Sequence, residues 1–272
     1  MPNTPPEAQV TVIIPAKNRQ ALLIRSVESI LKQPVLSRIV IIDDGSDIPL
    51  SIKSKTHPNR IKIIRLPHSR GPANARNIGL KFVSTPFVAF LDSDDYWQPD
   101  FLPSALGFLL HHPDCAAVMT LMRLVFEPGM SFFSKIRLLL FNVLKEASLG
   151  LFFYFNSGNV PRSFVYLCQV SQTIYNASFL RNLRFDVRYK FCEDWKFTFE
   201  VTRYGNLAIL PRRLINYSYS QSSNTFVQIR QAHQDKKKYY DLLSSTMRRE
   251  LGITLGVLLF DIYSKIFLVK SI

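Results

Sequence analysis

An apolar run that ends in three acidic residues lies in the first half of the chain: Phe87-Val88-Ala89-Phe90-Leu91-Asp92-Ser93-Asp94-Asp95. The five apolar residues are typical of a buried strand. In an open parallel sheet, ligands bind at the carboxyl ends of the strands. Mg²⁺ usually takes one or two carboxylates together with phosphate oxygens. The stretch therefore predicts a binding site for a metal ion and a diphosphate, with Asp92 and Asp94 as ligands of the metal. An acidic turn that caps the next helix is the alternative.

Strands and helices alternate on both sides of this stretch. The apolar patterns predict strands at 10–14, 38–42, 61–66, 116–121 and 206–210, and helices at 21–32, 72–83, 99–112 and 194–204. Asn176 is a plausible helix cap. Such alternation is typical of an α/β fold with a mostly parallel sheet.

Four polar segments follow predicted strands or open the next helix. They are Pro15-Ala16-Lys17-Asn18-Arg19, Asp43-Asp44-Gly45-Ser46, Gly71-Pro72-Ala73-Asn74-Ala75-Arg76-Asn77-Ile78-Gly79 and Asp92-Ser93-Asp94. All four are predicted to gather along one edge of the sheet, which is the place for a nucleotide. Taken alone, Asp43-Asp44-Gly45-Ser46 could be an ordinary turn, and Arg76 could be a solvated helix charge.

These four segments, in this order, resemble those of the inverting glycosyltransferases of family 2, which have the GT-A fold. The resemblance is strong over residues 10–121 and moderate over 176–210. It implies a Rossmann-like, mostly parallel sheet flanked by helices. It also implies transfer of a sugar, with inversion, from a nucleotide-diphosphate donor (UDP is favoured) to an acceptor hydroxyl. The acceptor would be a glycan or a lipid-linked molecule, in polysaccharide, lipopolysaccharide or glycolipid assembly.

The resemblance also implies which residues hold the donor. Asp44 would read the base, because a carboxylate can accept the imide N–H of uracil, while Asp43 would order the turn. The guanidinium fork of Arg76 suits phosphate oxygens. Asp94 would bind Mg²⁺ or Mn²⁺ directly, with Asp92 as a ribose or metal contact. The other implied nucleotide-binding residues are Pro15, Asn18, Arg19, Gly71 and Ser93.

A second acidic pair precedes a later helix, in Phe191-Cys192-Glu193-Asp194-Trp195. It resembles the Glu-Asp pair of the family, which makes Asp194 the implied base that removes the proton of the attacking acceptor hydroxyl. Both acids could instead be simple helix caps, because the positive end of the helix dipole stabilises negative side chains in the first turn. Many relatives carry a Tyr-Arg-x-His segment after the last strand. Residues 216–223 contain neither Arg nor His, so no further metal ligand is predicted there.

The chain is strongly basic, with 34 Lys and Arg against 20 Asp and Glu and a formal net charge of +14. This balance predicts an anionic partner. No nucleic-acid motif appears and the positive residues are dispersed, so nucleic acid is not expected. The basic and aromatic stretch at 132–141 and the apolar stretch at 251–272 favour peripheral membrane contact over ordinary core packing. No apolar run reaches the roughly 20 residues that a spanning helix needs.

The predicted organisation has three parts. Residues 1–9 are a flexible N-terminus without a signal-peptide pattern. Residues 10–230 are the GT-A domain, with a nucleotide-binding half at about 10–121 and an acceptor half at about 122–230. Residues 231–272 are a basic and apolar, hydrophobic helical appendage. Three scattered cysteines form no disulfide framework, which favours a reducing, cytoplasmic location at the cytoplasmic face of the membrane.

Two other functions remain open from the sequence. A sugar-phosphate nucleotidyltransferase shares the α/β architecture, but its glycine-rich loop after the first strand has no counterpart in Pro15-Ala16-Lys17-Asn18. A catalytically inactive relative that binds membrane or nucleic acid would not need the acids Asp44, Asp92, Asp94 and Asp194.

Overall fold

The computed structural model describes residues 9–52, 58–136, 138–140, 142–143, 169–180, 182–189 and 193–219. Its first elements are β1 Val10–Ala16, α1 Gln20–Leu31, β2 Ser37–Asp43, η1 Pro58–Arg60, β3 Ile61–Arg65, α2 Pro72–Leu80, β4 Phe87–Phe90 and β5 Tyr96–Trp97. The later ones are α3 Phe101–His111, β6 Cys115–Phe126, η3 Val170–Gln172, β7 Thr173–Asn176, α5 Ala177–Leu180, α6 Glu193–Val201 and β8 Asn206–Tyr219.

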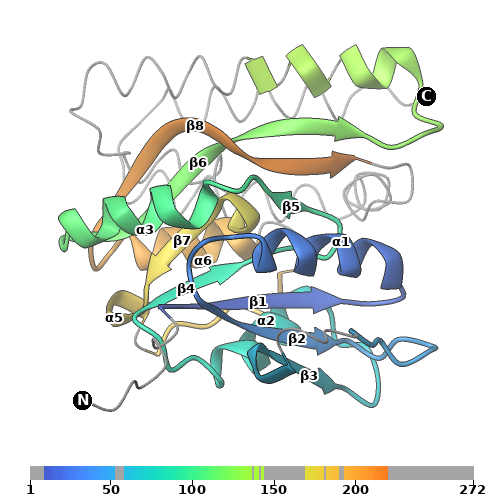
Figure 1. The fold of residues 1–272 in the computed structure, drawn as a ribbon, viewed down its shortest axis with the longest axis horizontal. Helices are drawn as coiled ribbons and strands as arrows, with labels where there is room; N and C mark the ends of the chain where they lie inside the picture. The colour runs from blue at the N-terminus through green and yellow to red at the C-terminus, as the bar shows by residue number, and fades with distance from the viewer. Residues whose placement is uncertain are drawn as a thin grey trace.

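The described strands form one eight-stranded sheet in the order β3-β2-β1-β4-β7-β6-β8-β5 (Figure 1). The strands β3, β2, β1 and β4 run parallel to one another. β7 is antiparallel to both β4 and β6, β6 runs parallel to β8, and β5 is antiparallel to β8. The predicted α/β class is confirmed, and the parallel character is strict only in the first half of the sheet.

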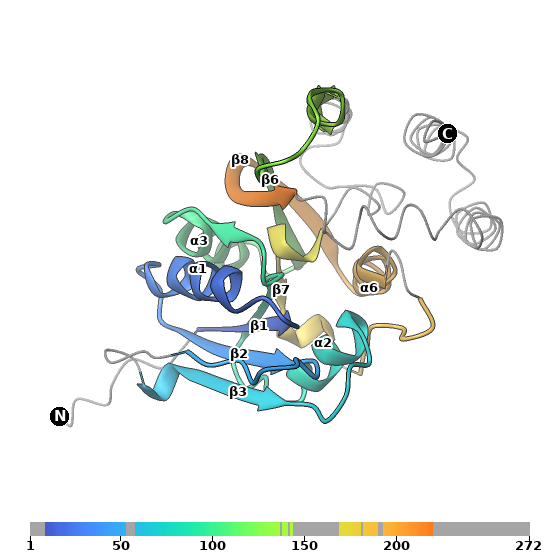
Figure 2. The same cartoon turned by 90° about the vertical axis from the view of Figure 1, so that its right-hand side faces the viewer.

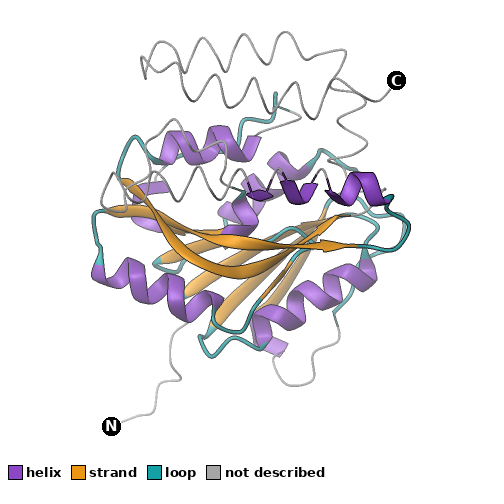
Figure 3. Ribbon diagram, turned by 90° about the horizontal axis from the view of Figure 1, so that it is seen from above, coloured by secondary structure: helices purple, strands orange, loops and turns teal. Residues whose placement is uncertain are grey.

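Helices cover both faces of this sheet (Figures 2 and 3). On one face α1 and α3 contribute residues such as Leu23 and Phe101 to the same hydrophobic cluster as Ile14 of β1. On the other face α2 and α6 pack through residues such as Ala73 and Phe197. A strand covered on both faces needs apolar residues on both, which explains why every residue of β1 is buried.

Close contact between α2 and the sheet depends on Gly79. A Cβ atom at Gly79 would lie 2.4 Å from Cγ2 of Ile13, so a larger residue would push the helix away from β1. The contact matters for function because α2 carries Arg76 on its buried side.

The structure differs from the predicted elements mainly in the second half. β6 and β8 are longer than predicted because each pairs with the other along most of its length. The four-residue β7 and the two-residue β5 are strands because of their sheet partners, and no local pattern predicted them. α3 begins at Phe101 and not at Pro99. Asn176 does cap a helix, the short α5, by accepting a hydrogen bond from the Ser178 amide at 3.1 Å.

Several predictions fall on residues that the structure does not describe. These are nearly all of the flexible N-terminus 1–9, the appendage 231–272, and a large part of the predicted acceptor half 122–230. Within the described ranges, no helix is long and apolar enough to cross a membrane.

Candidate active site

The loops after β1 and β2 are tied together by Asn18. This residue adopts a left-handed backbone conformation with φ of 53°, which asparagine tolerates better than most residues. Its side chain donates to the Asp47 carboxylate at 3.0 Å and accepts from the Asp47 amide at 2.8 Å. Its own amide donates to the Ser46 hydroxyl at 3.0 Å. Asn18 therefore fixes the rim of the sheet edge beside the buried Pro15.

The two acids at the end of β2, Asp43 and Asp44, bind different parts of the backbone. Asp43 accepts hydrogen bonds from the amides of Ser46 and Leu50, and so orders the turn as predicted. Burial alone would raise the pKa of Asp43, but these hydrogen bonds and the charge of Arg65 outweigh it and lower the pKa. Because the carboxylate stays ionised, it holds the turn at all ordinary pH values.

The carboxylate of Asp44 points toward the loop before α2. It accepts from the Ser69 hydroxyl at 2.7 Å and from the amides of Arg70 and Gly71 at 2.9 Å each. Gly71 itself has a φ of 89°, which favours glycine. Both oxygens of the predicted base reader thus already hold the backbone of this loop. A carboxylate offers about four acceptor sites, so one remains for a further donor.

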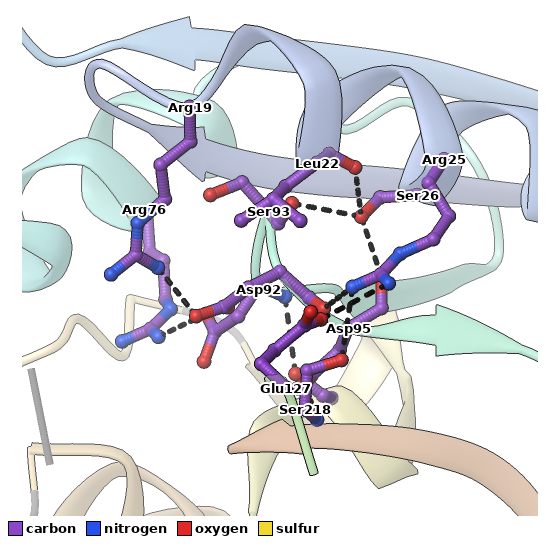
Figure 4. Close-up of polar contacts among 12 residues, drawn as sticks. Arg19, Leu22, Arg25, Ser26, Arg76, Asp92, Ser93, Asp95, Glu127 and Ser218 are labelled. Carbon is purple, nitrogen blue, oxygen red and sulfur yellow. Dashed lines mark hydrogen bonds and ion pairs between the residues drawn. The ribbon is translucent and has the colours of Figure 1, made fainter. Parts of the chain in front are cut away.

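The acidic turn after β4 lies at the same sheet edge, since β1, β2 and β4 are neighbours. Asp92 accepts from Nη2 of Arg76 at 2.6 Å, and Asp94 accepts from Nη1 of Arg19 at 2.5 Å. Ser93 is buried, and its carbonyl accepts from the Ser26 hydroxyl at 3.0 Å. The structure therefore brings together the predicted residues Arg19, Arg76, Asp92 and Ser93 (Figure 4), and Asp94 joins them through its contact with Arg19.

The acids of this turn fit a divalent cation that shares its ligands with phosphate. Burial and the neighbouring charge of Asp92 raise the pKa of Asp94, although Arg19 opposes the rise. Two carboxylates that repel each other are favoured by a cation between them. Among the described residues, no group of three or more His, Cys, Asp or Glu side chains could hold a metal ion. Two carboxylates completed by phosphate oxygens are, however, the usual protein share of a magnesium site.

Arg76 joins the acidic turn to the predicted catalytic helix. Its side chain is only 4% exposed, and Nη1 donates to the Glu193 carboxylate at 2.8 Å while Nη2 bonds Asp92. Burial would lower the pKa of Arg76, but the charges of Asp92, Glu193 and Asp194 raise it instead. In the structure, Arg76 is therefore a fixed cation among three acids. A phosphate bound by Arg76, as predicted, would share the guanidinium with these acids.

Asp194 stands in the first turn of α6 beside Glu193. It is half-buried, and one carboxylate oxygen accepts from the Trp195 amide at 2.9 Å. Burial and the charges of Glu193 and Asp92 raise the pKa of Asp194 to about 7, against the opposing effect of Arg76. A general base works best when its pKa lies near the operating pH. The environment of Asp194 therefore suits a proton acceptor, which a simple helix cap would not require.

Sequence reasoning did not identify Arg25. Its guanidinium donates to the Asp94 carbonyl at 2.7 Å and to the Ser218 hydroxyl at 3.0 Å, and it stacks 4.6 Å from the centre of the Tyr96 ring. The Ser218 amide in turn donates to the buried Asp95 carboxylate at 3.0 Å (Figure 4). Arg25 thus fastens the acidic turn to the end of β8. No local signal could have found it, because Ser218 lies 193 residues away.

Comparison with known proteins points to one family. The profile of glycosyl transferase family 2 matches residues 11–156. The pre-mycofactocin glycosyltransferase of Mycobacterium tuberculosis is 40% identical over 107 residues, which are 39% of this chain and 22% of that enzyme. The Escherichia coli enzyme WfgD, a UDP-Glc:alpha-D-GlcNAc-diphosphoundecaprenol beta-1,3-glucosyltransferase, is 34% identical over 103 residues, which are 37% of this chain and 41% of WfgD. The chain thus matches about a fifth to two fifths of the length of these relatives.

Solved structures agree on the fold. The complex of S. aureus TarS 1-349 with UDP-GlcNAc has a TM-score of 0.60 and 21% identity, and the match covers 79% of this chain and 60% of that one. The mannosyltransferase PcManGT from Pyrobaculum calidifontis, in complex with GDP-Man and Mn²⁺, has a TM-score of 0.58 and 18% identity, with 82% and 61% covered. The fold is that of the GT-A transferases. Since the family profile covers more than half of the 272 residues, the chain belongs to glycosyl transferase family 2.

Proposed function

We propose that the chain transfers a sugar, with inversion, from a UDP-sugar to an acceptor hydroxyl. The observation that carries the proposal is the bridge through Arg76, which holds the Asp92 turn and the Glu193–Asp194 helix start at one site. One side of this bridge offers carboxylates for a cation and a diphosphate. The other side offers a base with a pKa of about 7. The family favours this reaction over nucleotidyl transfer.

Donor binding is assigned to the sheet edge. Pro15, Asn18 and Gly71 would shape the nucleoside pocket, and the remaining acceptor site of Asp44 would take the imide N–H of uracil. WfgD is named for a UDP-Glc donor, and TarS was solved with UDP-GlcNAc. Both names support UDP as the donor nucleotide here. We assign the donor to residues of about 10–121 and the acceptor to residues of about 122–230.

Catalysis requires a base on the acceptor side and charge stabilisation on the donor side. Asp194 would accept the proton of the acceptor hydroxyl as its oxygen attacks the anomeric carbon and the bond to the diphosphate breaks. The positive charge of Arg76 would favour the ionised form of Asp194, and Glu193 would hold Arg76 in place. Asp94 and Asp92 would hold Mg²⁺ or Mn²⁺, and the bound cation would stabilise the charge of the leaving diphosphate.

The acceptor is proposed to be a glycan or a lipid-linked molecule reached at the cytoplasmic face of a membrane. WfgD acts on a diphosphoundecaprenol-linked sugar by its name, and the ExoU relative of Rhizobium meliloti is named for succinoglycan biosynthesis. The helical residues after Gly129 support membrane contact. Leu138 packs with Met130 and Tyr219, whereas Phe132 and Phe133 are 70% and 79% exposed. Such an apolar face on a basic protein suits anionic lipid.

A panel of nucleotide sugars tests the proposed reaction. Incubation with each donor, in Mn²⁺ and in EDTA, should release the nucleotide diphosphate only with a UDP-sugar and only with the cation. Release from GDP-sugars or ADP-sugars alone would contradict the assignment of Asp44 as the residue that recognises uracil. Release of pyrophosphate from UTP and a sugar phosphate would indicate nucleotidyl transfer instead.

UDP binding is expected to depend on a divalent cation and on Asp94. Calorimetric titration of UDP should show clearly tighter binding in Mn²⁺ than in EDTA for the wild-type protein. Asp94→Ala should lose most of this difference, because only Asp92 would remain to hold the cation. The matched control is Asp100→Ala, which removes an exposed acid that pairs with Arg212 and belongs to neither the acidic turn nor the proposed nucleoside pocket. Equal UDP affinity with and without Mn²⁺ in the wild-type protein would contradict the metal role.

The protein is expected to float with anionic liposomes. Flotation should weaken as salt screens the basic charge, but part should persist because apolar burial does not depend on salt. The double variant Phe132→Ser/Phe133→Ser should reduce flotation strongly. Ile48→Ser is the matched control, because Ile48 is 80% exposed in a different part of the fold. Failure of the wild-type protein to float at low salt would exclude the membrane contact.

A further inference from the structure

Each of the two acids proposed to hold the cation is already paired with an arginine. Arg19, directly before α1, binds Asp94, and Arg76, on α2, binds Asp92. Figure 4 shows both arginine side chains reaching toward the acidic turn from different elements. The charge of the acidic turn is therefore compensated within the protein itself, which weakens its attraction for a free cation.

The two arginines differ in how firmly they are held. Arg76 is 4% exposed, binds two carboxylates, and lies 5.4 Å from the centre of the Phe185 ring. The side chain of Arg19 is 25% exposed, and within the described residues its recorded hydrogen bond and ion pair are both with Asp94. The backbone beside Arg19 is fixed through Asn18. Arg19 thus combines a backbone next to a fixed residue with a partly exposed guanidinium that pairs with Asp94.

We propose that Arg19 is an exchangeable counter-ion, which holds Asp94 in the nucleotide-free protein and moves to the diphosphate when the donor binds. The proposal rests on the proposed function, since it takes UDP as the donor nucleotide. A diphosphate presents several anionic oxygens, and a guanidinium binds phosphate as readily as carboxylate. When Arg19 moves to the diphosphate, the Asp94 carboxylate becomes free to bind the cation that neutralises part of the diphosphate charge.

This exchange makes the cation and the nucleotide bind cooperatively. In the nucleotide-free protein, a cation must compete with Arg19 for Asp94 and therefore binds weakly. With UDP bound, Arg19 has a new anionic partner and the competition ends. By thermodynamic linkage, each ligand then raises the affinity of the other by the same factor. Arg19 is a positioning residue in this scheme, because it governs the availability of Asp94.

Binding of Mn²⁺ to the nucleotide-free protein tests the proposal without any measurement of activity. Free Mn²⁺ is measured by electron paramagnetic resonance during titration of the wild-type protein and Arg19→Gln, first alone and then with saturating UDP. Arg19→Gln should bind Mn²⁺ alone roughly fivefold more tightly, as expected when a partly exposed ion pair of about 1 kcal/mol no longer competes. The factor by which UDP raises Mn²⁺ affinity should fall by a similar amount.

Two further variants separate exchange from general charge and from folding. Lys17→Gln removes the same charge from an exposed neighbouring position and should leave Mn²⁺ affinity near the wild-type value. Arg19→Lys keeps the cation and should stay close to wild type, and thermal unfolding checks that each variant folds. Unchanged or weaker Mn²⁺ binding by nucleotide-free Arg19→Gln would overturn the proposal. If UDP fails to bind the wild-type protein, the proposed donor is wrong, whereas the nucleotide-free comparison still decides on Arg19.

Discussion

Replacement of Asp194 by asparagine is expected to lower turnover by about 10²–10⁴-fold, the usual contribution of a general base. The substitution keeps the shape of the side chain but removes its ability to accept a proton. UDP affinity should remain nearly unchanged, because Asp194 serves the acceptor side of the site. Steady-state rates with the donor identified by the nucleotide-sugar panel, together with calorimetric titration of UDP, measure the two effects separately.

The pH dependence gives this prediction a second test. Because the pKa of Asp194 is raised to about 7, the wild-type rate should rise with pH through about 7 as the carboxylate loses its proton. A raised carboxyl pKa also means that ionisation opposes folding, so stability is lost as pH rises from about 4 toward 7. Asp194→Asn should therefore unfold no more easily than wild type at pH 8. A rate loss at that pH would then be catalytic.

Glu193→Gln is the neighbouring control and should lower turnover less. The glutamine side-chain oxygen can still accept the hydrogen bond from Arg76. Near-normal turnover in Asp194→Asn would place the base elsewhere. Asp186 is then a poor substitute, because its hydrogen bonds from Arg188 lower the pKa of Asp186 despite partial burial. Glu193 would be the next residue to test.

Replacement of Arg76 by methionine is expected to lower the free energy of unfolding by about 3 kcal/mol. Removal of one partner from a buried ion pair leaves an uncompensated charge and typically costs about 3–5 kcal/mol. The lower end applies because the Asp92 side chain is 34% exposed and keeps access to water, while Glu193 is more deeply buried. Urea denaturation followed by circular dichroism measures the change.

Arg188→Met is the matched control, because it breaks an ion pair of similar length in which Arg188 is 82% exposed. Such pairs contribute little to stability, so this variant should unfold almost like wild type. The double variant Arg76→Met/Glu193→Gln should cost less than the sum of the single changes, since the second removes the charge that the first leaves unpaired. Equal free energies of unfolding for Arg76→Met and Arg188→Met would show that the ion pairs of Arg76 do not stabilise the fold.

The sequence by itself determined the strand ends and the acids that follow them. The run 87–91 predicted a buried strand because it is apolar throughout, and β4 Phe87–Phe90 confirms it. The same reasoning located β1, β2 and the helices between them. Burial patterns are local, since a strand or a helix repeats within a few residues. The order β2-β1-β4 then brings Asn18, Asp44 and Asp92 to one edge, as predicted. The roles of these residues in binding stay predictions.

Only the tertiary structure decided which charged groups meet. Arg76 pairs with Glu193, 117 residues away, and Arg25 reaches Glu127, 102 residues away. β7 became a strand because β4 and β6 lie on either side of it. The pKa of Asp194 depends on burial and on charges from three separate segments. Partner choice depends on the packing of distant elements, and no periodicity in the sequence records which side chains that packing will bring within a few ångströms of one another.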